Sequence, residues 1–286
     1  MPTTEARSYR DIAYGPSKAQ TLDLFLPSAD HVPARVVVFV HGGGWGEGDK
    51  ADGQEKGAMD GVRRGYAVAS VNYQLSGEAT FPAAILDVRA AIRFLRASAK
   101  RYRLDKDRFA AWGDSAGGHI VSLIGTAAKA PIFADTSLGH AGEPNTVKAV
   151  INWFAPIDLG VMDAQFIKSG AGKPDKSAPG SSESRFLGKT VSEAPELVKA
   201  ADPTTYIGSD CATFLIQHGD KDDLVPIEQS IDFAAALKSK LPPGQVELDI
   251  LKGAGHGGEP FESAANLDRV FAFLDKHLAT KKQKKT

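Results

Sequence analysis

The sequence predicts an α/β protein with a mostly parallel sheet of about eight strands and helices on both faces. Strand-like and helix-like runs alternate through most of the 286 residues, a pattern typical of a parallel sheet covered by helices. The run Val36–Val40 is continuously β-branched and aromatic, as expected of a strand buried on both faces. The apolar content of 42% is ordinary for a globular protein and supplies enough residues for such a core.

The first two strands are expected to differ from the others. Residues 9–14 and 21–26 flank the turn sequence Gly15-Pro16-Ser17, so we predict that they pair in antiparallel fashion. The alternation within Leu22–Leu26 predicts one partly solvated face. The remaining strand candidates are residues 36–40, 67–73, 109–112, 147–154, 213–217 and 246–251.

Long amphipathic stretches predict the main helices, at residues 81–102, 227–241 and 260–278. In the first stretch, apolar residues recur at helical spacing from Ile85 to Leu95. The basic residues between them are predicted to lie on the solvated side, and these are Arg89, Arg93 and Arg96.

Residues 157–207 interrupt the alternation and are rich in Gly, Ser, Lys and Pro. Segments of this length inside a compact domain are commonly lids or binding loops. We therefore expect a single domain over residues 1–286, in which residues 157–207 form a small, polar, lid-like insertion over the active site.

Composition excludes several classes of function. A net charge of −1 leaves no electrostatic footprint for nucleic acid, and no apolar run approaches the length of a membrane span. The polar segment Met1–Arg10 lacks a secretory signal, which predicts a cytoplasmic protein. Cys211 is the only cysteine, and its apolar surroundings predict a small core residue. No residues stand at zinc-site spacing, so we expect no metal and no cofactor.

The segment Trp112–Gly118 carries the strongest functional signal. It places Ser115 between Gly113 and Gly117, after a strand-like run and before a helix-like run. The α/β-hydrolase fold presents its nucleophilic serine in this way, and flanking glycines remove Cβ atoms that would clash in the strained turn. A glycine-rich loop before a buried helix can contain the same letters, so other segments must support the interpretation.

A second glycine-rich segment, His41-Gly-Gly-Gly-Trp45, directly follows the strand at residues 36–40. Consecutive glycines allow backbone N–H groups to point at one spot, where they stabilise the oxyanion of a tetrahedral intermediate; removing one such donor costs about 3–4 kcal/mol. The alternative is a phosphate loop. Glu47-Gly48-Asp49 follows where such a loop would carry Gly-Lys-Ser/Thr, so we favour an oxyanion hole.

The two remaining candidate groups are a carboxylate and a histidine. Asp220, Asp222 and Asp223 follow the strand at residues 213–217, where one of them could orient a histidine. At least one is also expected to cap the helix that begins near Pro226.

His256 is the histidine best suited to act as a base, because glycines surround it after the last strand. His119 lies one helical turn past Ser115 and is predicted to point away from the serine hydroxyl. His41 and His218 are expected to order their loops through hydrogen bonds.

The chain order of these candidates supports a common site. Ser115, Asp222 and His256 occur in the order that α/β-hydrolases use for serine, acid and histidine. All three follow strands, so they are predicted to lie at the carboxyl edge of the sheet, where open α/β sheets place their sites.

Together these motifs resemble the α/β-hydrolase carboxylesterases of the hormone-sensitive-lipase type. The resemblance is strongest to the BD-FAE-like branch, which includes acetyl-xylan and feruloyl esterases and general esterase/lipases. It extends from about Leu22 to Leu278. The motifs that carry it are His41-Gly-Gly-Gly-Trp45, Gly113-Asp-Ser-Ala-Gly-Gly118, His218-Gly-x-x-Asp222 and Gly255-His256-Gly257.

The resemblance implies Ser115 as nucleophile, His256 as general base and acid, and Asp222 as the orienting acid. Family members commonly carry proline at the position of Asp223, so the choice between Asp222 and Asp223 stays open here. The oxyanion hole implied by the resemblance comprises the backbone N–H groups of Gly43, Gly44 and Ala116.

The expected reaction is hydrolysis of small or short-acyl esters, such as acetylated or feruloylated sugars, through an acyl-serine. Trp153, Phe154 and Phe186 either line the pocket or belong to the core. One alternative is an arylformamidase, because the His-Gly-Gly-x-Trp signature also occurs in enzymes that cleave an N-formyl amide. A further alternative is an inactive homologue that only binds a ligand. This alternative is less expected, because all three triad residues are present.

Overall fold

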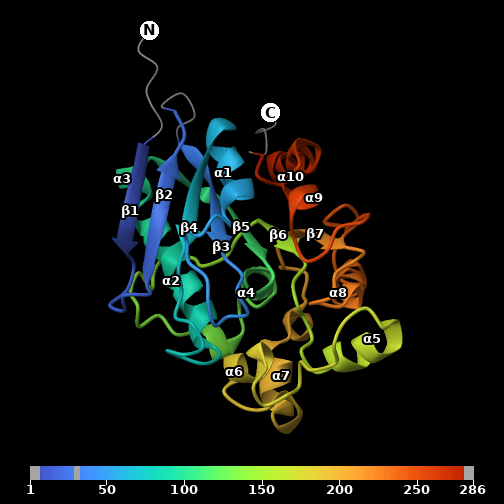
Figure 1. Cartoon of the computed structure of the whole chain (residues 1–286). Coiled ribbons are helices and arrows are strands. Elements are labelled where there is room, and N and C mark those ends of the chain that lie inside the picture. Colours follow the sequence, from blue (N-terminus) through green and yellow to red (C-terminus); the bar gives the residue numbers. More distant parts are fainter. Residues whose placement is uncertain (1–6, 29–32, 280–286) are drawn as a thin grey trace.

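An eight-stranded sheet crosses the centre of the protein (Figure 1). The structure is a computed structural model and describes residues 7–28 and 33–279. The strands lie in the order β1-β2-β4-β3-β5-β6-β7-β8, and among them β2 runs opposite in direction to all the others. Their bounds are β1 Arg7–Ala13, β2 Thr21–Leu26, β3 Ala34–Val40, β4 Tyr66–Val71, β5 Leu104–Asp114, β6 Ala149–Trp153, β7 Thr213–Gly219 and β8 Val246–Leu251. The predicted sheet of eight mostly parallel strands is therefore confirmed.

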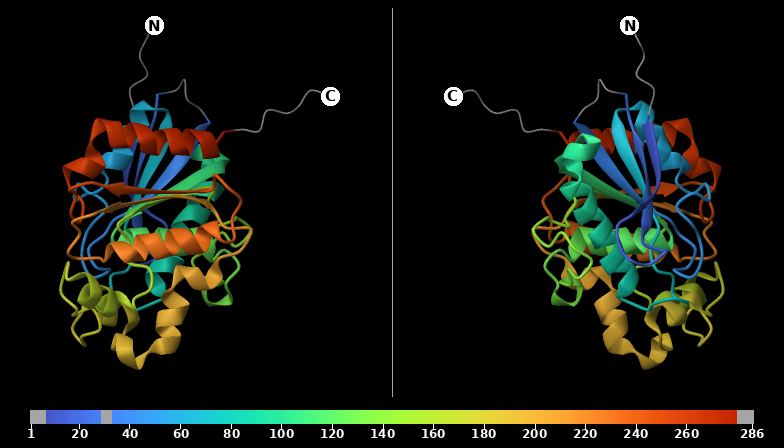
Figure 2. Two further views of the ribbon diagram at one scale, coloured as in Figure 1. Left: turned by 90° about the vertical axis from the view of Figure 1, so that its right-hand side faces the viewer. Right: turned by 90° about the vertical axis from the view of Figure 1, so that its left-hand side faces the viewer.

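Helices cover both faces of the sheet (Figure 2). One face carries α2 (Ala83–Ala97), α4 (Ala116–Thr126) and α8 (Ile227–Lys238), and the other carries α1 (Lys56–Arg63) and α10 (Ala264–His277). The sequence of β3 is continuously apolar from Val36 onwards because the strand is covered by a hydrophobic core on each face. Val36 and Val38 pack in the first core, whereas Val37 and Phe39 pack in the second.

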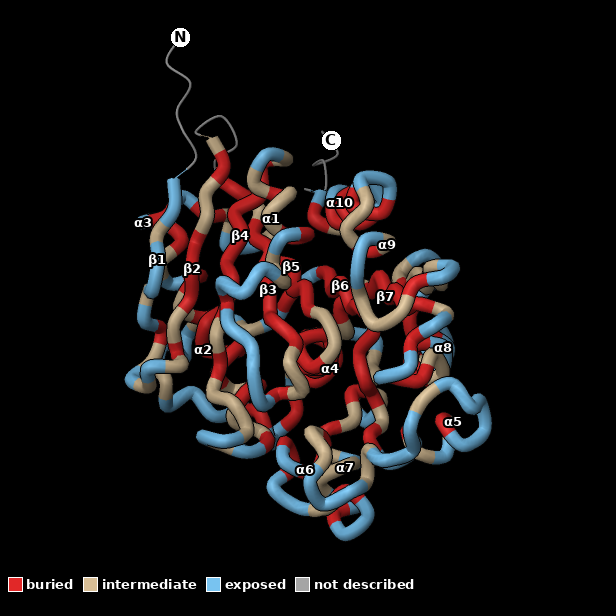
Figure 3. Tube along the Cα trace, viewed as in Figure 1, coloured by how far each residue is buried: buried red, intermediate tan, exposed pale blue. Residues whose placement is uncertain are grey.

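Residues 157–207 leave the sheet after β6 and return to it at β7. They form α5 (Met162–Ser169), α6 (Ser182–Leu187), α7 (Pro195–Ala201) and the short 3₁₀ turns η3 (Val191–Glu193) and η4 (Pro203–Tyr206). Figure 1 places these elements beyond the carboxyl ends of the parallel strands. Figure 3 shows that their outer surface is exposed while points of contact with the core are buried. The remaining short elements are α3 (Ala99–Tyr102), η2 (Pro131–Phe133) and α9 (Glu259–Glu262).

The three arginines of α2 are buried, so their predicted place on the solvated side is wrong. Arg89 and Arg93 are 1% exposed and Arg96 is 7% exposed. Their guanidinium groups donate to backbone carbonyls, mostly of the irregular segment 127–148, which lies against this side of the helix. Because that segment contains no strand and only the short 3₁₀ turn η2, many of its carbonyls have no regular partner, and the arginines supply donors. The acceptors are Lys106, Ala127, Phe133, Gly139, Pro144 and Thr146.

The expected partly solvated face of β2 is confirmed at Thr21 and Phe25, which are half-buried, but is wrong at Asp23. Asp23 is 1% exposed, and its carboxylate pairs with Arg10 at 2.6 Å and with Lys50 at 3.1 Å. Burial by itself would raise the pKa of Asp23, but hydrogen bonds from Asp11 N–H, Arg10 and Lys50 lower it. The polar position in Leu22–Leu26 therefore marks a covered ion pair.

Two features are absent from the described residues. None of the helices there combines the length and apolar character needed to cross a membrane. No cluster of at least three His, Cys, Asp or Glu side chains in this part of the chain could hold a metal ion.

Candidate active site

Ser115 lies at the sharp turn between β5 and α4, with a backbone φ of +51° that L-residues rarely adopt. The chain approaches itself closely at this turn. A Cβ atom on Gly113 would lie 2.4 Å from the carbonyl carbon of Gly117, and one on Gly117 would lie 2.0 Å from the carbonyl oxygen of Val40. The Ser115 N–H donates to the carbonyl of Trp153 at 2.9 Å, which fixes the turn against β6. The two motif glycines therefore have a direct steric cause.

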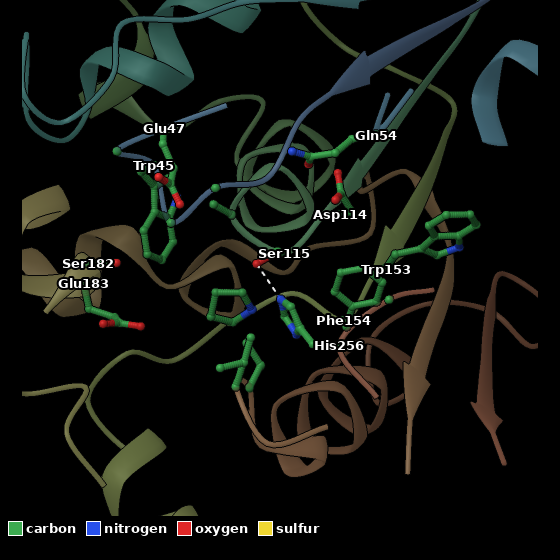
Figure 4. A pocket seen from close by; sticks show the side chains of 18 of the residues that line it. Trp45, Glu47, Gln54, Asp114, Ser115, Trp153, Phe154, Ser182, Glu183 and His256 are labelled. Carbon is green, nitrogen blue, oxygen red and sulfur yellow. Dashed lines mark hydrogen bonds between the residues drawn. The ribbon is translucent and has the colours of Figure 1, made fainter. Parts of the chain in front are cut away.

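The predicted triad residues come together at the carboxyl edge of the sheet. The Nε2 atom of His256 lies 2.9 Å from Ser115 Oγ (Figure 4). The Nδ1 atom of the same imidazole lies 2.7 Å from Asp222 Oδ2. Because a carboxylate only accepts, Nδ1 carries the proton and Nε2 is free to accept the serine hydroxyl proton. The side chain of His256 is 15% exposed, so it remains within reach of a substrate.

The structure separates the two aspartates that the sequence left as alternatives. Asp222 is 4% exposed, and its second oxygen, Oδ1, accepts the N–H groups of Leu224 and Val225 at 2.9 Å each. Asp223 is exposed at the protein surface. Only Asp222 of this pair hydrogen-bonds to His256 among the described residues.

The expected aspartate cap on the following helix is wrong. Helix α8 begins after Pro226 and has no side-chain cap. Asp222 instead closes the turn that precedes the helix, and Asp220 accepts the N–H of Gly253 at 2.6 Å. Asp220 and Asp222 thus connect the loop after β7 to the loop after β8. This connection holds Asp222 next to His256.

His218 orders its loop, as predicted, and also contacts the acid. Its imidazole is fully buried, with Nδ1 2.7 Å from Ser230 Oγ and Nε2 3.1 Å from both the Val225 carbonyl and Asp222 Oδ2. Burial alone would raise the pKa of Asp222, but hydrogen bonds from His218 and His256 hold that pKa well below its ordinary range. Asp222 is therefore ionised across neutral pH.

Backbone donors converge beside Ser115. Gly43, Gly44 and Ala116 line the same cavity as the serine, and no described residue accepts a hydrogen bond from their N–H groups. Ala116 is the first residue of α4, where N–H groups lack helical partners. The Gly42 N–H is already used, because it donates to the Gln54 side chain at 2.7 Å.

Gln54 is a site residue that the sequence reasoning missed. Its side-chain oxygen holds the glycine loop from behind through Gly42, while its amide nitrogen donates to Asp52 at 2.9 Å. No spacing or motif connects it to His41–Trp45, because the contact depends on how the loop folds back. Gln54 therefore helps to hold the glycine-rich loop His41–Trp45 in place.

The cavity around Ser115 has a volume of about 850 Å³ and two different walls. Figure 4 shows Trp153 and Phe154 on one side of Ser115, and Trp45 and Glu183 on the other. The Phe154 ring lies against the His256 imidazole, with centroids 4.6 Å apart. The sequence left open whether these aromatic residues line the pocket or belong to the core. Trp153 and Phe154 line the pocket.

Phe186 belongs to the core instead of the pocket wall. It is 2% exposed and stacks on Trp45, which does line the cavity, with ring centroids 4.5 Å apart.

Asp114, directly before Ser115 in the sequence, has a second buried carboxyl group at the cavity. One of its oxygens has no hydrogen-bond partner among the described residues. Burial, and then the charge of Asp52, raise the pKa of Asp114 to about 7. Near neutral pH its carboxyl group therefore carries only part of a negative charge beside Ser115.

The two other histidines discussed from the sequence, and the cysteine, form side-chain contacts within the protein that do not involve the Ser115 hydroxyl. His119 is fully buried and donates through Nε2 to the Ala201 carbonyl at 2.7 Å, away from the serine hydroxyl as predicted. Burial lowers the pKa of His119 to about 4. His41 donates through Nδ1 to the Gly42 carbonyl at 2.8 Å. Cys211 is half-buried against the core and accepts the Gly208 N–H at 3.2 Å.

The fold, together with the arrangement of Ser115, His256 and Asp222 at the carboxyl edge of the sheet, is that of the α/β-hydrolase class. Comparison with known families narrows the class, because the BD-FAE family model matches residues 22–237. The chain belongs to the BD-FAE family.

Individual relatives agree with this assignment. Esterase LipC of Mycobacterium tuberculosis is 29% identical over 89% of this chain and 61% of its own length. Kynurenine formamidase avaC of Aspergillus versicolor is 29% identical over 76% of this chain and 81% of its own length. A solved truncated carbohydrate esterase from gut microbiota is 25% identical, with a TM-score of 0.85 over 98% of this chain and 99% of that one.

The chain spans only part of several curated relatives. It covers 61% of LipC and 52% of Esterase LipQ from the same organism.

Proposed function

We propose that the protein is a serine carboxylesterase, with Ser115 as nucleophile, His256 as general base and acid, and Asp222 as the orienting acid. The observation that carries the proposal is the continuous hydrogen-bonded line from Ser115 Oγ through the imidazole to Asp222, with contacts of 2.9 Å and 2.7 Å. A serine hydroxyl is a weak nucleophile without such a base.

In the proposed reaction, His256 Nε2 takes the hydroxyl proton as Ser115 Oγ attacks the ester carbonyl. The oxyanion receives hydrogen bonds from the backbone N–H groups of Gly43, Gly44 and Ala116, which the described residues leave unpaired. The protonated imidazole then gives its proton to the leaving alcohol. Water repeats the steps on the acyl-serine and releases the acid. Asp222 keeps Nδ1 protonated and stabilises the imidazolium.

The proposed substrates are esters with small or short acyl groups, such as acetylated or feruloylated sugars. The cavity supports this, because residues 157–207 contribute polar and charged groups to its wall, namely Lys176, Ser182, Glu183 and Arg185. A long acyl chain would have to displace water from these groups without replacing their hydrogen bonds. We propose that residues 157–207 act as a fixed polar insertion over the site within a single domain. A cytoplasmic location also remains our prediction.

Replacement of the nucleophile tests the proposal. Wild-type protein should hydrolyse p-nitrophenyl acetate, and Ser115→Ala should lower kcat by about a million-fold, because triad members act as a unit. A series of p-nitrophenyl esters should show its highest kcat/KM at short acyl chains. Retention of most of the rate by Ser115→Ala would contradict the mechanism, and a maximum at long chains would contradict the substrate class.

An arylformamidase is the second candidate, and the similarity to a kynurenine formamidase favours it. The same serine, imidazole and oxyanion donors can cleave an N-formyl amide, since the tetrahedral intermediate carries the same charge. A kcat/KM for N-formylkynurenine above that of every simple ester would favour this activity.

A further inference from the structure

The cavity wall opposite the aromatic side contains a buried carboxylate that the proposed mechanism does not use. Glu183 is 7% exposed, lies in the first turn of α6 and lines the cavity. Figure 4 shows its carboxylate directed into the cavity, across Ser115 from Trp153 and Phe154. A side chain so placed can contact a substrate that is bound at the serine.

Neighbouring polar groups leave Glu183 with acceptor capacity. The Ser181 hydroxyl has a single proton, which it donates to the Lys176 carbonyl at 2.6 Å, while its oxygen accepts the Ser184 N–H at 3.0 Å. The Lys176 ammonium pairs with Asp175 at 3.1 Å. Burial raises the pKa of Glu183 above its ordinary value, although its own backbone N–H, the charge of Lys176 and the Ser181 hydroxyl offset part of that rise. A carboxylate has about four acceptor positions, so these few donors leave some of them free. A carboxylate buried without its full set of donors costs free energy, which a donor on a ligand recovers.

Helix α6 is fixed to the oxyanion loop, so Glu183 holds a defined position relative to the reacting atoms. Phe186 stacks on Trp45, which directly follows the glycines of that loop. A Cβ atom on Gly44 would lie 2.8 Å from Ser182 Oγ, so the first turn of α6 and the loop are in close contact. Binding groups held this firmly in advance lose little entropy when a ligand arrives.

We propose that Glu183 is a specificity-determining residue that accepts a hydrogen bond from a hydroxyl group of the ester substrate. This inference rests on the proposed esterase function and deepens it. Lys176 and Arg185 line the same cavity, and their positive charges oppose an ammonium ligand, so a neutral hydroxyl is the donor that fits. An ester without that hydroxyl would leave the carboxylate desolvated and unpaired.

Two matched pairs of esters test the inference and show which part of the substrate carries the hydroxyl. Glycerol monoacetate and propyl acetate differ on the alcohol side, and ethyl 3-hydroxybutyrate and ethyl butyrate differ on the acyl side. In at least one pair, wild-type kcat/KM should favour the hydroxylated ester by about 10- to 100-fold. Glu183→Leu should bring that ratio close to one, and Glu183→Gln should keep part of it because an acceptor oxygen remains.

Control measurements separate the possible outcomes. Glu196→Leu removes an exposed carboxylate of α7 that lies outside the cavity, and it should keep the wild-type ratio. The Tm of each variant reports its folding. If Glu183→Leu does not fold, the test rests on Glu183→Gln, in which the preference for the hydroxylated ester should be smaller than in wild-type protein.

A ratio of one in wild-type protein for both pairs, or an unchanged ratio in the Glu183 variants, overturns the inference. A wild-type preference for 2-(dimethylamino)ethyl acetate over glycerol monoacetate that disappears in Glu183→Leu also overturns it, because Glu183 would then recognise charge. Hydrolysis of p-nitrophenyl acetate needs no hydroxyl on the substrate. Its absence in wild-type protein would therefore count against the proposed esterase function itself.

Discussion

The loops at the carboxyl ends of β5, β7 and β8 and the insertion at residues 157–207 meet at one cavity but are held in place differently. The loops inherit their positions from paired strands, which bring Ser115, Asp222 and His256 into one hydrogen-bonded line. The insertion has no strand among its described elements. It is held by side-chain packing on Trp45, by the His119 contact and by separate hydrogen bonds, such as the one from the Phe81 N–H to the Phe186 carbonyl at 2.8 Å. Strand pairing thus positions Ser115, Asp222 and His256, whereas side-chain packing and separate hydrogen bonds position the insertion's side of the cavity.

Among the variants that test this comparison, the larger expected effect separates two neighbouring carboxylates on one loop at the sheet edge. Asp222→Asn should lower kcat by about ten-thousand-fold, because the loss of the carboxylate removes the acceptor that fixes the imidazole tautomer. Asp223→Asn is the matched control and should change kcat little, since the Asp223 side chain is exposed and does not contact His256. Steady-state kinetics with p-nitrophenyl acetate measures both. Equal losses in the two variants would mean that the loop as a whole, and not the single hydrogen bond, supports His256.

The turn at Ser115 and the glycine-rich loop at His41, both at the carboxyl edge of the sheet, could be predicted from the sequence for a physical reason. Strand-to-helix turns and glycine-rich loops impose backbone conformations that few residues tolerate, so the requirement appears directly in the letters around Ser115 and His41. The choice between Asp222 and Asp223 could not be made in this way from the residues alone. It depends on which carboxylate the turn directs inward, and the hydrogen bonds from Leu224 and Val225 decide that.

A smaller effect tests the attachment of the insertion. Burial lowers the pKa of His119 to about 4, whereas an unperturbed histidine titrates near 6.5. As pH falls, the unfolded chain takes up the proton first. The stability from neutral His119 is therefore complete above pH 6.5 and is lost as pH falls towards 4, by about 3 kcal/mol in total.

Urea unfolding of wild type and His119→Gln, at about pH 7.5 and about pH 4.5, measures this loss. Glutamine can still donate to the Ala201 carbonyl but does not titrate. Its free energy of unfolding should therefore decline less between the two pH values. A parallel decline in both proteins would show that His119 is not held neutral by burial.

Packing and burial explain what the sequence did not predict. A helical pattern separates apolar from polar positions, but it does not say that a second segment will cover the polar side, as residues 127–148 cover Arg89, Arg93 and Arg96. The same limit applies to the insertion. Composition marked it as polar, yet nothing in the spacing indicated that Glu183 would face Ser115 or that Phe186 would lie beneath Trp45.

Covalent labelling with a fluorophosphonate tests the central claim most directly, because the reagent traps a serine only when base and oxyanion donors activate it. Intact mass should show one label per wild-type chain, peptide mapping should place it on Ser115, and Ser115→Ala should take up none. Asp222→Asn should label far more slowly than Asp223→Asn. Labelling that persists in Ser115→Ala, or maps to another residue, would contradict the assignment of Ser115 as the nucleophile.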